Sequence, residues 1–293
     1  MSDVVGAVAA LWRFPVKSMQ GEQVSEAELT EQGVVGDRAY ALIDAQTGKV
    51  ASGKSVTMYP TLLACRASFV EPPRPGREPP IVQISLPEGA QVTSDSPRVN
   101  SVLSNFFGRD VVLARSAPED FTIDQYHPDV EDPDSAGVVV EQKLGSALFG
   151  EVGLPSPVAV GSFLDAFPVS VLTTATLRRL KALRSDTAFE PRRFRMNVIV
   201  DTDQVGFAEN NWVGRGLHLA DEVRLRVALP DPRCVMTTLA QEDLPRDNEV
   251  LRTLVHHNRI DLPGGLGRLP CAGVYAVVEL PGTARVGDQV VLD

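Results

Sequence analysis

The chain has 293 residues, with 28 basic and 38 acidic side chains, which gives a formal net charge of −10 at neutral pH. This acidic balance excludes nucleic acid and anionic lipid as general partners, so any basic site has to be local. Hydrophobic residues make up 43% and charged residues 23%, as in an ordinary globular protein, and the length suits two domains.

The sequence predicts a cytoplasmic protein in a reducing compartment. Its first residues place no basic segment ahead of a short apolar run, and no stretch reaches the roughly 18 to 20 apolar residues that span a bilayer. Export and membrane anchoring are therefore not expected. The three cysteines, Cys65, Cys234 and Cys271, are odd in number and far apart, which argues against a disulfide framework.

Short strands dominate the predicted secondary structure. Apolar and β-branched runs, separated by glycine and proline, predict strands over Val4–Leu11, Ala39–Ile43, Leu62–Phe69, Ile81–Leu86, Val198–Val200, Val223–Leu229, Val235–Leu239 and Val274–Val278. The start of Val223–Leu229 alternates apolar and polar residues, which is typical of a strand with one exposed face. The pattern predicts antiparallel sheets or barrels.

Few helices are expected. The clearest should begin with Ser96 as N-cap and Pro97 at the first helical position, and should end at Gly108. Apolar residues at helical spacing also predict helices over Thr174–Leu183 and Asn248–His257. We interpret the last two as packing elements.

Two proline-rich segments interrupt this pattern. Ala117–Ala136 is rich in Asp, Glu and Pro, and we interpret it as a linker between an N-terminal domain (residues 1–116) and a C-terminal domain (residues 137–293). The same segment could instead cover an active site. Glu71–Pro80 lies between two predicted strands and is interpreted as an exposed hairpin insertion.

Gly48–Ser55 matches the phosphate-binding pattern GxxxxGK[ST], but its context argues against a phosphate-binding loop. Such a loop must begin a long helix after its serine, whereas Val56–Pro60 brings β-branched residues and a proline. We therefore interpret the segment as a glycine-containing hairpin. Zinc sites and nucleophile-elbow hydrolases also lack their CxxC, HExxH and GxSxG signals.

Cys234 is the main candidate for a reactive residue. It follows the rigid segment Pro230-Asp-Pro232, lies beside Arg233, and precedes a predicted strand. A thiol becomes an effective nucleophile or metal ligand when nearby cations or a metal stabilise its anion. From position alone, a structural role is equally compatible with the sequence. Cys65 is expected in the core and Cys271 as a spectator in a glycine-rich loop.

Short motifs in a defined order along nearly the whole chain carry a family resemblance. They are Phe14-Pro-Val-Lys-Ser18, Gly36-Asp-Arg38, Phe194-Arg-Met-Asn197, Arg233-Cys234 followed by Thr237-Thr238, Gly273-Val-Tyr275 and Val286-Gly-Asp288. In this order they resemble the MOSC family, named for the C-terminal domain of molybdenum cofactor sulfurase, and especially its amidoxime-reducing branch. The resemblance implies a mainly β (α+β) fold, in which a smaller N-terminal β-barrel-like domain precedes a MOSC-type antiparallel β-barrel.

The resemblance also implies a pterin-type molybdenum cofactor between the two domains, with the Cys234 thiolate as metal ligand. The family positions that hold the phosphate and pterin are matched by Lys17, Ser18, Arg38, Arg195 and Asn197. Lysine and arginine suit a phosphate, and an asparagine amide suits a pterin edge. Arg233 lies beside the thiolate, and Asp165 should either line the same cavity or stabilise a turn.

Three residues depart from the family pattern: Met196 replaces a common proline, and Pro232 and Phe167 replace serines that help line the cofactor. Each proposed site residue also has an ordinary interpretation when taken singly, as an exposed charge or a polar group at a strand end. The shared order of the motifs is what favours a common site.

The resemblance implies a molybdenum-cofactor-dependent reductase that transfers two electrons to N-hydroxylated or related N- and S-oxygenated compounds. No fused iron–sulfur cluster is expected, so the electrons should come from a separate reductase, ferredoxin or haem protein. One alternative is a sulfur carrier that receives a persulfide on Cys234 from a cysteine desulfurase. Another is a noncatalytic cofactor carrier. A family-level association with pyridoxal phosphate is also implied, with no residue assigned to it.

The substrate is expected to be selected by loops such as Ala117–Ala136 and Asp201–Trp212.

Overall fold

Seven strands close into a barrel in the C-terminal part of the computed structural model, which describes residues 3–128, 137–263, 265 and 267–293. In order around the barrel they are β12 (Val169–Thr173), β13 (Val198–Asp201), β1 (Asp3–Arg13), β19 (Gln289–Leu292), β14 (Gly216–Leu219), β15 (Val223–Pro232) and β17 (Gly267–Leu280). Because β17 also pairs with β12, the ring is complete. The prediction of a mainly β barrel fold is confirmed.

The barrel is antiparallel except at one pair. Strands β12 and β13 are parallel, because the chain crosses between them through helix α3 (Thr174–Leu183). Thr173 caps this helix by accepting a hydrogen bond from the backbone N–H of Thr176. The predicted bounds of α3 are confirmed, whereas a fully antiparallel barrel is not.

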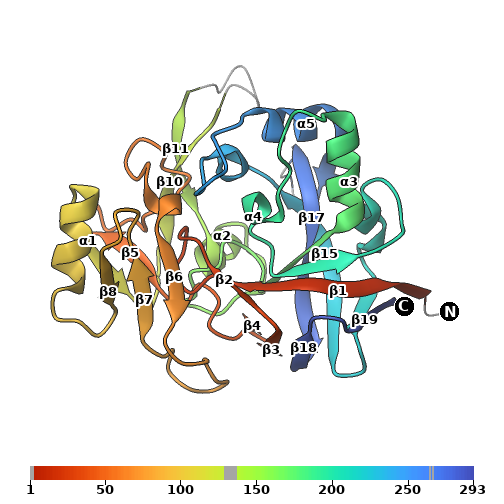
Figure 1. Cartoon of the computed structure of the whole chain (residues 1–293), viewed down its shortest axis with the longest axis horizontal. Coiled ribbons are helices and arrows are strands. Elements are labelled where there is room, and N and C mark those ends of the chain that lie inside the picture. Colours follow the sequence, from red (N-terminus) through yellow and green to blue (C-terminus); the bar gives the residue numbers. More distant parts are fainter. Residues whose placement is uncertain (1–2, 129–136, 264, 266) are drawn as a thin grey trace.

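Alternating side chains of the barrel strands fill its interior. In β15, Val223, Leu225 and Val227 are buried, while Arg224 and Arg226 point outward, as the sequence pattern predicts. Helix α5 (Glu249–His257) and strand β16 (Arg259–Leu262) pack against β17. Figure 1 shows α3 and α5 beside the barrel, on the side away from the smaller lobe.

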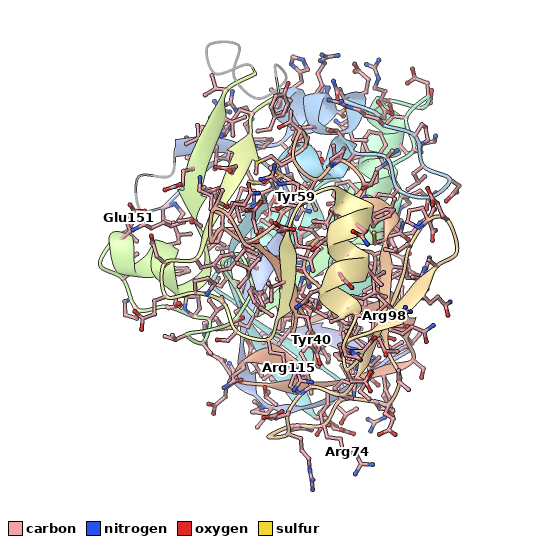
Figure 2. All side chains as sticks on the ribbon, turned by 90° about the vertical axis from the view of Figure 1, so that its left-hand side faces the viewer. Tyr40, Tyr59, Arg74, Arg98, Arg115 and Glu151 are labelled. Carbon is pink, nitrogen blue, oxygen red and sulfur yellow. The ribbon has the colours of Figure 1, made fainter. Side chains whose placement is uncertain are left out.

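The smaller lobe contains short paired strands around a separate core. Strand β5 (Ala41–Asp44) pairs with β9 (Val111–Ala114), and β7 (Val82–Ser85) pairs with both β6 (Arg66–Phe69) and β8 (Gln91–Thr93). Helix α1 (Val99–Phe107) covers this core and lies in front in Figure 2. The Glu71–Pro80 segment connects β6 to β7, as predicted for a hairpin insertion.

The two ends of the chain pair with each other in the barrel part of the molecule. Strand β1 belongs to the barrel, and β3 (Glu26–Thr30) pairs with both β4 (Gly33–Val34) and β18 (Gly282–Arg285). Strand β2 (Glu22–Val24) pairs with β1. Residues from the first thirty positions are therefore held by strands from the last hundred, and the domain limits at 116 and 137 stay predictions.

Part of the predicted loop Ala117–Ala136 is a strand. Strand β10 (Thr122–Tyr126) pairs with β11 (Val139–Lys143), and helix α2 (Gly145–Glu151) follows. The sequence interpretation missed β10 because the segment is rich in acidic residues. Its Ile123 is nevertheless fully buried beside other apolar side chains. The remainder of that prediction, from residue 129 onward, lies outside the described residues.

The predicted strand Val235–Leu239 is wrong, because Val235–Thr238 forms the 3₁₀ helix η4. The hydroxyls of Thr237 and Thr238 donate to the carbonyls of Cys234 and Val235, at 3.0 and 2.8 Å, so side chains satisfy groups that a strand ladder would use. Residues Val235 to Thr238 are all buried. Burial, rather than strand pairing, explains this apolar run.

Three further predictions need adjustment. The first half of Leu62–Phe69 is the 3₁₀ helix η1 (Leu62–Ala64), and only its second half is a strand. Helix α1 begins later than predicted, with Arg98 as N-cap, because Ser96 Oγ accepts from Arg98 N within a preceding turn. Cys271 lies in strand β17, buried, instead of in a loop.

No helix in the described part of the chain has the length and apolar character needed to cross a bilayer. The cytoplasmic location stays a prediction.

Candidate functional site

A cavity lined by both halves of the chain gathers all eight site residues that the sequence predicts. It encloses about 750 Å³ of empty space, its open mouth included. Its walls contain the eight predicted site residues Lys17, Ser18, Arg38, Asp165, Arg195, Asn197, Arg233 and Cys234. The described residues of Ala117–Ala136 and Asp201–Trp212 do not line it, so their expected part in shaping the pocket is not seen there.

Cys234 lies between the end of β15 and η4, instead of between a turn and a strand. It is partly exposed, whereas Cys65 and Cys271 are buried and burial raises the pKa of each to about 12. Among the three thiols, Cys234 therefore has the access that chemistry requires.

A close approach between the lobes brings Lys54 to Cys234. A β-carbon added at Gly53 would lie 2.6 Å from the sulfur of Met236, so glycine lets this loop pack directly against η4. The neighbouring strand β10 holds the loop, because Tyr126 N donates to the Lys54 carbonyl at 3.0 Å. Burial would lower the pKa of Lys54, but the charges of Asp165 and Cys234 outweigh burial and raise it.

Asp165 lies between two ammonium groups. Its Oδ1 pairs with Lys17 and its Oδ2 lies 2.9 Å from Lys54 Nζ. Burial would raise the pKa of Asp165, but the two lysine charges hold it far below its ordinary value. Lys17 Nζ also donates to the Phe163 carbonyl at 2.9 Å, and burial lowers the pKa of Lys17 to about 8. Of its two predicted roles, Asp165 has the cavity-lining one.

Two guanidinium groups lie over one aromatic ring. The central carbons of Arg38 and Arg195 are each 4.4 Å from the ring centroid of Phe14. Arg38 pairs with Asp37 and donates to the Arg195 carbonyl at 3.1 Å. The Arg195 guanidinium donates to no acceptor among the described residues, although Arg195 is only 8% exposed. Burial, together with the Arg38 charge, lowers the pKa of Arg195 to about 9.

The backbone is strained at the same place. Ser18, Arg38 and Arg195 have φ angles of 62°, 48° and 56°, in the left-handed region that non-glycine residues rarely occupy. They account for three of the five such non-glycine residues in the described chain. Each costs on the order of 1–3 kcal/mol, and strain of this kind concentrates where function fixes a geometry.

Asn197 connects the strands that surround the site. Its Oδ1 accepts from the backbone N and the hydroxyl of Ser170, at 3.1 and 3.0 Å. Its Nδ2 donates to Asp37 Oδ2 at 2.9 Å and to the Trp12 carbonyl at 3.4 Å. Both amide hydrogens are therefore directed to protein acceptors. Contact with a pterin edge stays a prediction for Asn197, whose visible contacts position Asp37.

Arg233 ties the cysteine-bearing segment to the barrel. Its guanidinium pairs with Asp231 Oδ2 at 2.5 Å and donates to the Phe194 carbonyl, while its backbone N–H donates to the Pro270 carbonyl at 2.7 Å. Asp231 is buried, and burial raises its pKa to about 6 in spite of the Arg233 charge. These contacts fix the backbone on the N-terminal side of Cys234.

An aromatic pair forms another part of the cavity wall. Phe167 and Tyr275 stack with ring centroids 5.2 Å apart and an interplanar angle of 17°. Phe167 and Pro232, where the family pattern has serines, both line the cavity, so this wall is less polar than the pattern suggests.

Sequence reasoning missed Lys54, Asp37 and Asp231. Lys54 lies in Gly48–Ser55, whose sequence context argues against a phosphate-binding loop, and Asp37 lies inside the Gly36-Asp-Arg38 motif. The motif therefore offered a signal for Asp37 in the sequence. The position of Lys54 depends on a contact between lobes, which no local pattern reveals.

The comparisons with known proteins agree with this architecture. The model of the MOSC N-terminal beta barrel domain matches residues 5–109, and that of the MOSC domain matches residues 159–291. Together they cover most of the chain, which therefore belongs to the MOSC family, and the resemblance seen in the sequence motifs is confirmed.

Within the family, the chain is similar to the amidoxime-reducing components. It is 26% identical to human mitochondrial amidoxime-reducing component 1, over 98% of this chain and 83% of that protein. The mouse protein of the same name is also 26% identical, over 98% of this chain and 82% of its own length. Among solved structures, the YUAD protein from Bacillus subtilis aligns over 100% of this chain and 96% of its own, with 10% identity and a TM-score of 0.45.

Proposed function

We propose that this protein is an oxidoreductase that holds a pterin-type molybdenum cofactor and reduces N-hydroxylated or related N- and S-oxygenated compounds. The observation that carries the proposal is Arg195, a buried guanidinium with no acceptor among the described residues, in the cavity that also contains the accessible thiol Cys234. The Arg195 nitrogens reach the cavity, and a guanidinium binds anionic oxygens well. An anionic ligand would supply acceptors for the Arg195 guanidinium, and a metal in that ligand would be bound by the Cys234 thiolate.

The charges of the cavity fit such a ligand. Five cationic side chains line it, namely Lys17, Arg38, Lys54, Arg195 and Arg233, against the two carboxylates Asp165 and Asp231. This excess of positive charge favours an anion, and lysine and arginine are the residues that bind phosphate best. Lys17, Ser18, Arg38 and Arg195 would hold the phosphate and pterin, and the soft Cys234 thiolate would bind molybdenum.

When bound, the cofactor would supply the two-electron redox chemistry. The chain itself would hold the thiolate in place. The Lys54 ammonium would stabilise the negative charge on Cys234 Sγ, and the Arg233 contacts with Asp231 and Phe194 would fix the backbone that carries it. Reduction of an N–OH bond also consumes two protons. Asp231, whose carboxyl pKa burial raises to about 6, would exchange protons near neutral pH.

We propose a separate protein as the electron donor, a reductase, ferredoxin or haem protein. The three cysteines of this sequence are too few for a four-thiolate iron–sulfur cluster. The similarity to amidoxime-reducing components supports an amidoxime as the first substrate to test.

The test is anaerobic turnover of an amidoxime by protein produced in cofactor-synthesising cells, with reduced methyl viologen as electron donor. The wild type should form the amidine, and Cys234→Ser should lose nearly all of that activity, because the thiolate would be a direct ligand of molybdenum. The exposed-site variant Arg98→Met serves as the matched control and should keep full activity. Molybdenum-loaded protein that reduces no amidoxime, N-oxide or sulfoxide would contradict the proposed reaction.

A further inference from the structure

One cation of the cavity, Lys54, is not among the residues that would hold the phosphate and pterin. Its side chain is 13% exposed and lines the cavity from the smaller lobe, while Cys234 lines it from the segment after β15. The segment that carries Lys54, Gly48–Ser55, has the lysine and serine of a phosphate-binding pattern but continues into turns instead of a long helix. The cavity therefore contains a cation whose role the cofactor alone does not explain.

Hydrogen bonds hold the backbone on both sides of Lys54. Lys54 N donates to Ser52 Oγ at 3.2 Å, and Tyr126 N donates to the Lys54 carbonyl at 3.0 Å. Ser55 Oγ donates to the Asp124 carbonyl at 2.5 Å. Ser52 and Ser55 are buried, whereas the Lys54 side chain reaches the cavity. This arrangement fixes where the ammonium enters the cavity.

The ammonium of Lys54 has donors to spare. Asp165 Oδ2, at 2.9 Å, is the only carboxylate oxygen in ion-pair contact with Lys54 Nζ within the described chain, and an ammonium carries three N–H groups. Asp165 also pairs with Lys17, so one carboxylate faces two ammonium groups and one positive charge is left over. Lys54 can therefore bind a polar atom that enters the cavity without breaking its contact with Asp165.

Lys54 lies beside the reactive position. Gly53 packs against Met236, which is two residues after Cys234 and lines the same cavity. The Lys54 ammonium and the Cys234 thiolate are close enough for their charges to interact. An atom that is brought to Cys234 through the cavity therefore also approaches an ammonium with donors to spare.

We propose that the Lys54 ammonium binds the oxygen atom of the N–O or S–O group when a substrate approaches Cys234. This inference rests on the proposed function, which supplies the class of substrate. An ammonium is a compact point charge with rotatable donors, so it suits a single oxygen, whereas a guanidinium fork suits the paired oxygens of a phosphate. The amidine product has lost that oxygen and is itself a cation, so the same ammonium repels it and favours its release.

The first test uses cofactor-free protein and does not depend on turnover. Iodoacetate and iodoacetamide alkylate the same Cys234 thiolate, but only iodoacetate carries an anionic oxygen. The ratio of their two rate constants, measured by peptide mass spectrometry, therefore reports a cation beside the sulfur independently of the thiol pKa. Lys54→Met should lower the ratio of iodoacetate to iodoacetamide about tenfold or more, as expected for loss of a hydrogen bond to a charged group. Lys54→Arg, which keeps the charge, should retain most of the wild-type ratio.

Two other lysines provide matched controls. Lys49, in the same segment, pairs with two carboxylates outside the cavity, so Lys49→Met should keep the wild-type ratio. Lys17→Met removes the other ammonium on Asp165 and should lower the ratio less than Lys54→Met does. If Lys54→Met does not fold, Lys54→Gln removes the same charge. The proposal is overturned if the Lys54 variants keep the wild-type ratio, or if Lys17→Met lowers it equally, because the charge of the whole cavity would then explain the effect.

The loaded enzyme separates this proposal from the proposed function. Lys54→Met produced in cofactor-synthesising cells should contain as much molybdenum as the wild type, while its kcat/KM for an amidoxime should fall about tenfold or more. Lys54→Arg should recover part of this loss. A large fall in molybdenum content would assign Lys54 to the cofactor and overturn the proposal. A wild type without molybdenum would instead defeat the proposed function, and the alkylation ratio would still decide whether Lys54 binds oxygen ligands beside Cys234.

Discussion

Replacing Arg195 with methionine should stabilise the cofactor-free protein and at the same time remove its capacity to retain the cofactor. Arg195 is only 8% exposed, its guanidinium donates to no acceptor within the described residues, and it lies near the charge of Arg38. In the absence of a ligand, the fold therefore carries a buried charge without an ion-pair partner. Such a cost is acceptable at a binding site, because the ligand relieves it.

The magnitude follows from the pKa of Arg195. A decrease from 12.5 to about 9 corresponds to about 5 kcal/mol at about 1.36 kcal/mol per pKa unit, an upper limit because water in the cavity solvates the charge. The ring contact with Phe14, lost in the variant, offsets about 1 kcal/mol. We expect Arg195→Met to gain about 1–3 kcal/mol in free energy of unfolding. Because the folded pKa is depressed, this penalty is complete below about pH 9 and is relieved as the pH rises toward 12.5.

The assay is urea unfolding of cofactor-free wild type and Arg195→Met at pH 7, followed by circular dichroism. Arg98, which is exposed and labelled in Figure 2, gives the matched control Arg98→Met, whose stability should change by less than about 0.5 kcal/mol. Loss of more than about 1 kcal/mol in Arg195→Met would refute the reasoning, since it would mean that Arg195 already has a stabilising partner in the empty protein.

Three further predictions concern the thiols and one barrel glycine. At pH 8, an alkylating reagent should modify Cys234 and spare Cys65 and Cys271, because burial raises the pKa of each of these two thiols to about 12. Peptide mass spectrometry measures the labelling of each cysteine, and rapid labelling of Cys65 in the folded protein would contradict the prediction. The pKa values of Cys65 and Cys271 in the folded protein lie above the ordinary 9.0, so the protonated thiols contribute stability that is complete below pH 9 and is lost as the pH rises toward 12. Over that range the free energy of unfolding should fall by up to about 1.4 kcal/mol per pH unit for each thiol. Gly273→Ala should cost about 3 kcal/mol or more in urea unfolding, since its φ is +81° and the new carbon would lie 2.7 Å from a backbone oxygen of β12. Gly150→Ala, a helical position with nothing within 4 Å, is the control and should be neutral or slightly stabilising; equal effects of the two changes would count against the packing described for β17.

The sequence predicted the periodic elements of the fold well, because their pattern directly reflects burial. The alternation in Val223–Leu229 corresponds to a strand with the expected buried face. Thr174–Leu183 forms the expected helix, in which Leu180 of the apolar stripe is buried and Leu177 and Leu183 are half-buried. Val235–Leu239 failed for a physical reason. Its residues are apolar because they pack beneath the site, and threonine hydroxyls bind the local carbonyls in place of a neighbouring strand.

The candidate site was predicted as a set of residues but not as a geometry. Motif order singled out residues such as Lys17, Arg195 and Cys234, which line one cavity although more than two hundred positions separate the first from the last. The ion pairs of Asp165 and the approach of Lys54 depend on contacts between the lobes. Contacts of this kind leave no local pattern, so no reading of spacing could predict them.

We propose that Cys234 holds molybdenum in a cavity whose excess positive charge binds the rest of the cofactor. The most direct test of this proposal is elemental analysis for molybdenum, with pterin fluorescence after oxidation, on wild type and Cys234→Ser made in cofactor-synthesising cells. We expect close to one molybdenum per wild-type chain and a large fall in the variant. Equal molybdenum in both proteins, or none in either, would contradict it, and a labile persulfide on Cys234 after treatment with a cysteine desulfurase would then favour sulfur transfer.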